Sequence, residues 1–131
     1  MRWRGLLLLS VMLGATLVHA DGAAPAAARL LDGVRAFRAD RYEEALAAFR
    51  EAERAGIAEQ ELSIYLGPTL FKLGRLREAR EVLVRAHRSA APDPVAEYYL
   101  GLTYYRLGLV RLAREVFTGL DRAAAGPKLA E

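Results

Sequence analysis

Three stretches of sequence, each beginning with glycine, decide the fold. They read GVRAFRADRYEEALAAF from residue 33, GPTLFKLGRLREAREVL from residue 67 and GLTYYRLGLVRLAREVF from residue 101. The glycines Gly33, Gly67 and Gly101 are thirty-four residues apart, with no insertion or deletion between the stretches. A fixed period of this length is the sequence signature of a repeat architecture. The chain therefore predicts three copies of one supersecondary unit.

Five further columns of similar side chains recur in the same register after the glycines. They are Phe37, Phe71 and Tyr105; Tyr42, Leu76 and Val110; Ala45, Ala79 and Ala113; Phe49, Leu83 and Phe117; and Ala52, Ala86 and Leu120. In the first unit, the spacing of Tyr42, Ala45 and Phe49 places three apolar residues on one face of a helix. Charged residues such as Glu43 and Arg50 fall on the other side, which is typical of an amphipathic helix.

Each unit divides into two helices at recognisable stop and start signals. Gly74 and Gly108 are placed to end helices in a left-handed turn. Asp93 followed by Pro94 is an N-cap with proline in the first helical position. Pro68 falls inside a predicted helix and removes a hydrogen-bond donor there, so we expect a kink or an irregular turn. The predicted helices are 26–38, 42–54, 59–72, 76–88, 94–106 and 110–125, which makes the fold all-α.

These residues resemble the tetratricopeptide repeat (TPR) family, whose unit is a thirty-four-residue antiparallel helix pair. The resemblance is clearest in the third unit. Its matching residues there are Leu100, Gly101, Tyr104, Tyr105, Gly108, Val110, Ala113 and Phe117. The first unit departs most, because Asp32 stands where the family has leucine and Asp40 where it has the inter-helix glycine.

The resemblance covers nearly all of the chain after its first twenty residues. It gives repeats at about 26–59, 60–93 and 94–127 within a single domain at residues 21–131. It implies a right-handed superhelical solenoid of three helix-turn-helix repeats that binds a peptide or a protein. The family relationship indicates the fold strongly and the partner only weakly.

The first twenty residues form a separate segment. Two arginines, Arg2 and Arg4, precede an uncharged apolar run at residues 6–18. The tripeptide Val18-His19-Ala20 then supplies small residues at the positions that a signal peptidase reads. We therefore predict a cleavable signal peptide at residues 1–20 and a mature chain that begins at Asp21.

An uncleaved membrane anchor is the alternative interpretation of this segment. The apolar run has thirteen residues, whereas a spanning helix needs about 20. Asp21 and Pro25 also oppose its extension. We therefore expect export without a stable membrane anchor, to the periplasm if the source is bacterial and to the outside of the cell otherwise.

Charge and cysteine content exclude several classes of function. Of the 19 Lys and Arg residues, two lie in the leading segment, which leaves 17 against 16 Asp and Glu in the rest. A nearly balanced chain lacks the basic surface that drives nucleic-acid binding. The chain has no cysteine, so disulfides, thiolate metal sites and cysteine nucleophiles are excluded.

No set of residues indicates catalysis. The only histidine after the leading segment is His87, on a charged helix, and metal sites need several converging ligands. Carboxylate pairs such as Glu43-Glu44 have arginines three or four residues away, which solvated ion pairs explain. Phosphate-loop, dinucleotide and nucleophile-elbow motifs are missing. The sequence therefore predicts no enzyme, no cofactor and no metal site.

The resemblance also implies a binding groove lined by the first helix of each unit. The corresponding residues are Leu30, Val34, Phe37, Arg38, Ile64, Pro68, Phe71, Lys72, Tyr98, Leu102, Tyr105 and Arg106. They form an apolar and aromatic trough edged by three basic side chains, which suits an apolar peptide with carboxylates along one side. In the alternative, these residues serve packing and solubility only.

One specialised TPR function fits poorly. Members that clamp a carboxyl terminus have polar groove residues, especially asparagine, where this chain has Val34, Pro68 and Leu102. The sequence therefore argues against a carboxylate clamp.

A second apolar surface is predicted on the last helix. Leu109, Leu112 and Val116 form a stripe at helical spacing, and charged residues occupy the first two of these columns in the earlier units. Because only a few residues follow, we expect the stripe to be an interface, unless the C-terminal tail folds over it. Two functions follow as expectations: an exported scaffold or adaptor of the cell envelope, and alternatively a self-associating subunit, such as a homodimer, assembled through this helix.

Overall fold

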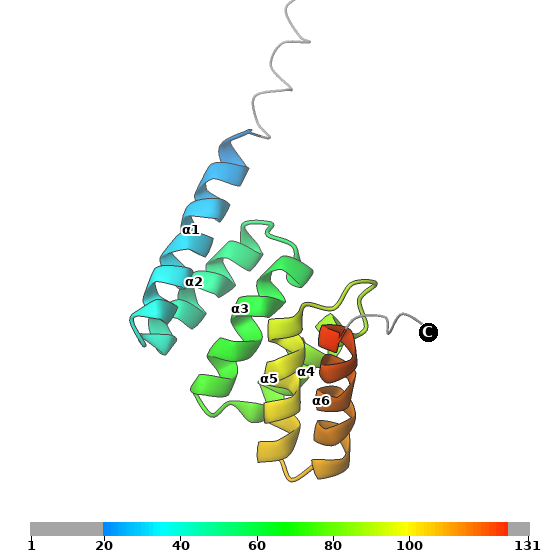
Figure 1. The fold of residues 1–131 in the computed structure, drawn as a ribbon. Helices are drawn as coiled ribbons and strands as arrows, with labels where there is room; N and C mark the ends of the chain where they lie inside the picture. The colour runs from blue at the N-terminus through cyan, green and yellow to red at the C-terminus, as the bar shows by residue number, and fades with distance from the viewer. Residues whose placement is uncertain (1–19, 126–131) are drawn as a thin grey trace, which may run out of the picture.

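The computed structural model describes residues 20–125, which form six α-helices and no strand (Figure 1). The helices are α1 (Ala20–Arg38), α2 (Tyr42–Arg54), α3 (Glu59–Lys72), α4 (Leu76–His87), α5 (Pro94–Arg106) and α6 (Val110–Ala125). The predicted all-α class is confirmed. The bounds agree with those expected from the sequence, except that α4 ends one residue earlier and α1 begins at Ala20 rather than at residue 26.

The early start of α1 follows from its composition. Alanine has the highest helix propensity, and the segment from Ala20 to Ala28 is mostly alanine. Pro25 lies inside the helix without ending it. The apolar run at 6–18 lies outside the described residues, so the signal peptide stays a prediction. Within residues 20–125, none of the helices has the length and the hydropathy that a membrane span requires.

Pro68 does not produce the irregular turn considered for it. α3 is a single helix from Glu59 to Lys72, and Pro68 is buried within it. In the following residue, the Thr69 hydroxyl donates to the carbonyl of Tyr65 at 2.6 Å, and Thr103 makes the equivalent bond in α5 at 2.6 Å. We infer that burial of the proline ring offsets the hydrogen bond that it removes.

A tight turn closes each helix pair in the same way. After α1, α3 and α5 the chain passes through a left-handed residue: Asp40 (φ 58°), Gly74 (φ 74°) and Gly108 (φ 77°). In the first turn, the amide of Arg41 donates to the carbonyl of Ala36 at 2.9 Å, which is the long hydrogen bond of a Schellman-type helix end. Aspartate tolerates this conformation better than most side chains, so the first unit closes without the glycine.

The glycine column lets the two helices of each pair approach closely. At each of three positions, an added Cβ would lie less than 3.0 Å from a large side chain of the paired helix. The three pairs are Gly33 with Phe49, Gly67 with Leu83, and Gly101 with Phe117. The same contact thus recurs every thirty-four residues, which gives the chain a helical-repeat-like architecture.

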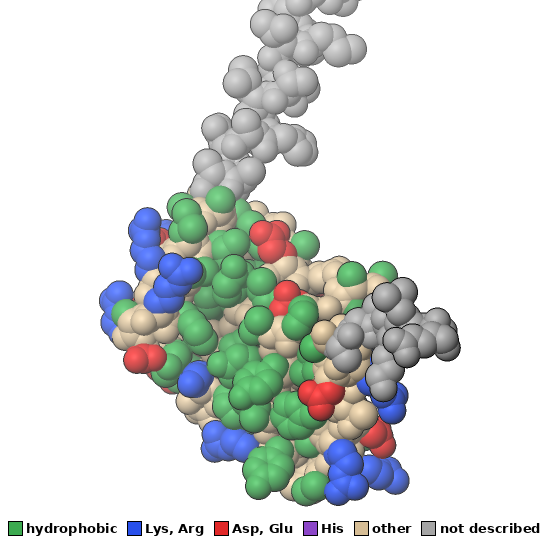
Figure 2. All heavy atoms as spheres, viewed as in Figure 1, with side chains coloured by type: hydrophobic (Ala, Val, Ile, Leu, Met, Phe, Trp, Pro, Cys, Tyr) green, Lys and Arg blue, Asp and Glu red, His purple; other side chains and the backbone are tan. Residues whose placement is uncertain are grey.

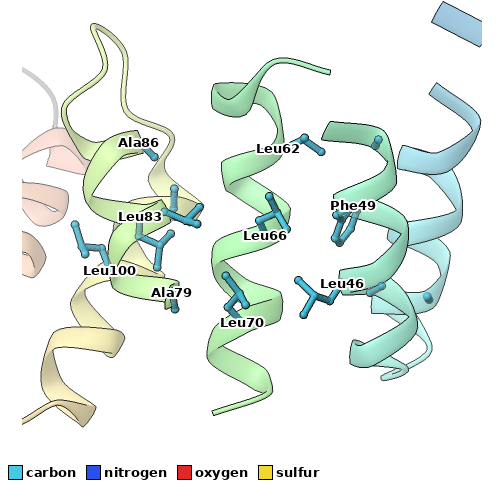
Figure 3. Packing of buried hydrophobic residues seen from close by; sticks show 14 residues of the cluster. Leu46, Phe49, Leu62, Leu66, Leu70, Ala79, Leu83, Ala86 and Leu100 are labelled. Atoms are coloured by element: carbon cyan, nitrogen blue, oxygen red, sulfur yellow. The ribbon is translucent and has the colours of Figure 1, made fainter. Parts of the chain in front are cut away.

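The helix pairs follow one another across the molecule from α1 at one end to α6 at the other (Figure 1). Each helix packs against the next, and α3 also contacts α5. The core lies between the pairs: α3 is flanked by α2 on one side and by α4 on the other (Figure 3). The labelled core residues are Leu46, Phe49, Leu62, Leu66, Leu70, Ala79, Leu83, Ala86 and Leu100.

Candidate functional site

The predicted groove residues lie on the surface that α1, α3 and α5 present together, called here the first-helix face. On the side drawn in Figure 2, hydrophobic side chains gather in a band over these helices, with Lys and Arg side chains along its margins. Five of the predicted residues are half-buried and packed against the core, namely Leu30, Val34, Phe37, Ile64 and Phe71. Five are exposed, namely Arg38, Lys72, Tyr98, Tyr105 and Arg106, and Leu102 is half-buried.

Pro68 is the one predicted groove residue that is buried. Because α5 packs against α3, we infer that it covers this position. Pro68 therefore belongs to the core and cannot contact a ligand, which corrects its inclusion in the groove.

An aromatic cluster surrounds Phe71 at the middle of the first-helix face. The guanidinium carbon of Arg106 lies 5.3 Å from the centroid of the Phe71 ring. The ring centroid of Tyr99 lies 5.5 Å from that of Phe71 in an edge-on arrangement, and the ring centroids of Tyr98 and Tyr99 are 5.7 Å apart. A cation above a ring and edge-to-face aromatic pairs are both favourable. The cluster therefore holds rings of two first helices in fixed positions.

Tyr99 was missed from the sequence. It belongs to a column, Leu31, Tyr65 and Tyr99, whose members are thirty-four residues apart and all large and apolar or aromatic. Tyr65 stacks on Phe49 of α2, with 5.4 Å between the ring centroids. This column fills the junction between one helix pair and the next. Its period is the signal that would have identified it.

The three basic side chains at the margin share a position as well as a charge. Arg38, Lys72 and Arg106 each lie in the last turn of a first helix. A cation there is stabilised by the negative end of the helix dipole. Their placement therefore has a structural explanation, and they are also exposed and available to a carboxylate of a ligand.

Exposed large hydrophobic side chains are concentrated at the ends of the array. They are Leu31, Val95, Tyr98, Tyr105, Leu109 and Val110. Tyr105 is 64% exposed, whereas its equivalent Phe71 is half-buried beneath α5. Val110 is 50% exposed, whereas its equivalent Leu76 is half-buried. Within the described residues no helix follows α6, so these side chains lack the cover that the next pair gives to their equivalents.

The predicted second interface is partly covered within the chain. Leu109 is 37% exposed, Leu112 is half-buried and Val116 packs against the core. In the first unit the equivalent stripe borders α1: a hollow there is lined by Arg41 and Glu44 together with Arg35. Whether the stripe is an interface stays a prediction.

Ion pairs occupy the columns of Leu109 and Leu112 in the earlier units. Arg41 contacts Glu44 at 2.7 Å and Arg75 contacts Glu78 at 2.8 Å. The hydrogen bonds that Arg75 donates to the Glu78 carboxylate lower the pKa of Glu78 and raise the pKa of Arg75. These pairs lie in the first turn of α2 and α4, where the acidic side chain also favours the helix dipole.

A surface hollow lies beside the start of α3. It measures about 430 Å³ and lies where α3 begins, α4 ends and the connection to α5 passes. Ile64 is its one predicted groove residue, and Ser89 contributes a buried hydroxyl without a hydrogen-bond partner in the described structure. Glu61 and Asp93 also line it. Nothing in this lining resembles a catalytic or metal-binding set.

His87 links two helix pairs. Its Nδ1 lies 2.8 Å from a carboxylate oxygen of Glu97, so α4 and α5 are joined at this point. Among residues 20–125, no three His, Cys, Asp or Glu side chains gather closely enough to hold a metal ion.

No family model matches the chain, and no curated protein matches it. The resemblance to TPR proteins therefore rests on the repeated residues. The contacts that recur with the same period are consistent with it.

Proposed function

We propose that this chain is a TPR-like protein-binding scaffold, whose helix pairs form a right-handed superhelical solenoid of three repeats. Three kinds of contact that recur at a period of thirty-four residues support the repeat: the glycine contacts, the left-handed turns and the threonine back-bonds. A repeat of this length made of two helices is the TPR unit.

The observation that carries the binding function is the exposure of Tyr98 and Tyr105 on the first-helix face. Tyr98 is 50% exposed and contacts Tyr99, which packs on the half-buried ring of Phe71, and Tyr105 is 64% exposed. Tyrosine and arginine are enriched among the residues that contribute most binding energy at protein interfaces. Arg106 in the same cluster and Lys72 at the margin favour a ligand with carboxylates next to apolar side chains.

The proposed setting is the cell envelope. The leading segment has the layout of a signal peptide, which takes the rest of the chain across a membrane. The chain then acts as an adaptor or assembly factor: it positions a partner rather than changing it chemically. This role needs no cofactor.

Affinity capture from an envelope extract tests the proposal, with the captured protein identified by mass spectrometry. The variant is Tyr98→Ala with Tyr105→Ala, and the matched control is Val110→Ala, which also shortens a 50% exposed apolar side chain but lies outside the predicted groove and the predicted stripe. We expect the double variant to lose the partner while its far-UV spectrum and melting temperature stay close to wild type, because both rings are half-exposed. A double variant that binds normally contradicts the groove.

Self-association is a second candidate function, and the exposed side chains at the two ends of the array favour it. Leu31 at one end and Tyr105 at the other are the most exposed large hydrophobic residues of the described chain. A structural subunit that assembles through its ends would bury both.

A further inference from the structure

Each junction between helix pairs includes a tyrosine of the same column, Tyr65 at the first junction and Tyr99 at the second. At the first junction, Tyr65 stacks on Phe49. At the second, Tyr99 packs on Phe71 and the guanidinium of Arg106 lies over the same ring. At each junction, an aromatic ring of one helix pair is therefore covered by side chains of the pair that follows it.

Within the described residues, the first and the last helix pair carry complementary halves of this junction. At the start, Leu31 stands in the column of Tyr65 and Tyr99, and is 55% exposed. At the other end, Tyr105 stands in the column of Phe71, and Phe117 in the column of Phe49. Each end of the array therefore carries residues from the columns that meet at the internal junctions.

A charged pair adds to this match. The second junction is joined by His87 and Glu97, which lie 2.8 Å apart. Asp121 on α6 stands in the column of His87, and Arg29 on α1 in the column of Glu97. The pair is reversed in sign but complementary, and both side chains are exposed. Within one chain the Nε of Arg29 already lies 2.9 Å from Glu51, so the docked arrangement adds a second carboxylate to this guanidinium.

We propose that a second copy of this chain docks head to tail, with its α1 on the end face formed by α5 and α6. Leu31 of the second copy lies against Phe117 and Tyr105, whose equivalents Phe49 and Phe71 contact Tyr65 and Tyr99 at the internal junctions. Arg38 of the second copy lies over the Tyr105 ring, as Arg106 does over Phe71. Arg29 of the second copy pairs with Asp121. The proposal goes beyond peptide binding and does not depend on it.

The contact between copies is more polar than the junctions inside the chain. On α1, Asp32 and Arg35 replace the buried Leu66 and Thr69 of α3. On α6, Arg114 replaces Leu46, so a guanidinium lies near the carboxylate of Asp32 in the docked arrangement. Exposed ion pairs contribute little and are screened by salt. The association is therefore reversible and sensitive to both salt and protein concentration.

The geometry leads to open chains of copies. A head-to-tail interface uses two different surfaces, so each added copy presents a fresh end unless a ring closes. A symmetric pairing of two α6 helices, by contrast, stops at a dimer. A segment of the same chain that covers the end face leaves a monomer.

Light scattering after size exclusion tests the arrangement on protein recovered after export, with its N-terminus established by intact mass. We expect the mean mass to rise beyond a dimer with concentration at about 10 mM ionic strength, where the Debye length is about 30 Å, and to fall at about 100 mM, where it is about 10 Å. Asp121→Arg and Arg29→Asp should each weaken association by roughly tenfold or more, because each places like charges together. The double variant restores the pair with reversed sign and should recover association.

Two further variants keep the test decisive. Glu115→Arg makes the same charge change elsewhere on α6 and should associate like wild type. Leu31→Glu alters a side chain that is mostly exposed, so it should fold, as its melting temperature would report, and remain monomeric. A monomer at every concentration overturns the proposal. So does an assembly that survives both charge reversals, which indicates symmetric pairing, or a double variant that fails to recover.

Discussion

Leu83 of α4 occupies the space that a Cβ of residue 67 in α3 would fill, so Gly67 is the point of closest approach within the second helix pair. Leu83 is fully buried and surrounded by core side chains. It cannot move aside as an exposed side chain could. The close approach of the two helices therefore depends on the absence of a side chain at Gly67.

Gly67→Ala should destabilise the protein for this reason. Overpacking of a well-packed core costs typically about 1–3 kcal/mol, which urea unfolding can measure. The matched control is Gly119→Ala in α6, where an added Cβ meets nothing within 4 Å. Replacement of an exposed helical glycine by alanine should stabilise the fold by about 0.5–1 kcal/mol. If both substitutions have the same effect, the glycine column does not set the helix spacing.

A second prediction separates the residues of the α6 stripe. Val116→Glu should lower the melting temperature, because Val116 packs against the core and a buried carboxylate is costly. Leu109→Glu should leave the melting temperature nearly unchanged, because Leu109 is exposed. Differential scanning fluorimetry on the two variants is sufficient. If Val116→Glu has the melting temperature of wild type and changes only partner capture, the stripe is an interface.

A third prediction concerns Glu78. Arg75 holds the pKa of Glu78 below its usual value through a hydrogen bond. A carboxylate with a lowered folded-state pKa contributes stability above its unfolded-state pKa, and this contribution is lost as pH falls through the folded-state pKa. The side chain is largely exposed, so the effect on stability is small. Carbon-detected NMR titration should show the pKa of Glu78 rising in Arg75→Leu; an unchanged value contradicts the pair.

A fourth prediction concerns processing. The apolar run and the small residues before Asp21 predict cleavage after Ala20. Intact-mass measurement of protein from the exporting cell should therefore give a chain that begins at Asp21, in the soluble fraction. A protein that keeps Met1 and fractionates with membranes would show that the segment is an anchor.

The helices could be predicted closely because local signals and the period coincide. Glycine at the left-handed turns and the Asp93-Pro94 cap give the boundaries directly, and their repetition every thirty-four residues removes ambiguity. The start of α1 was wrong because a run of alanines carries no boundary signal and continues a helix at little cost. The thirty-four-residue period assigns Pro68 to a groove position, because the period alone does not show that α5 covers this residue.

Exposure was harder to predict than helix position. Equivalent residues such as Phe71 and Tyr105 have the same place in the repeat but different neighbours. A further helix pair follows the unit of Phe71, and within residues 20–125 no helix pair follows the unit of Tyr105. A column such as that of Leu112 shows which residues share a face of a helix, but not which neighbour that face meets. The exposure of side chains at the ends of an array can therefore be assigned only from the three-dimensional structure.

Site-specific photo-crosslinking tests the binding function most directly. A photoreactive phenylalanine analogue replaces Tyr105 on the first-helix face in one variant and Glu81, which is exposed on α4, in another. After irradiation in the intact cell envelope, the account predicts that position 105 gives an adduct with a partner protein, apart from any crosslink to a second copy of this chain, and that position 81 gives none. An adduct of the same partner from position 81 and none from position 105 would contradict it.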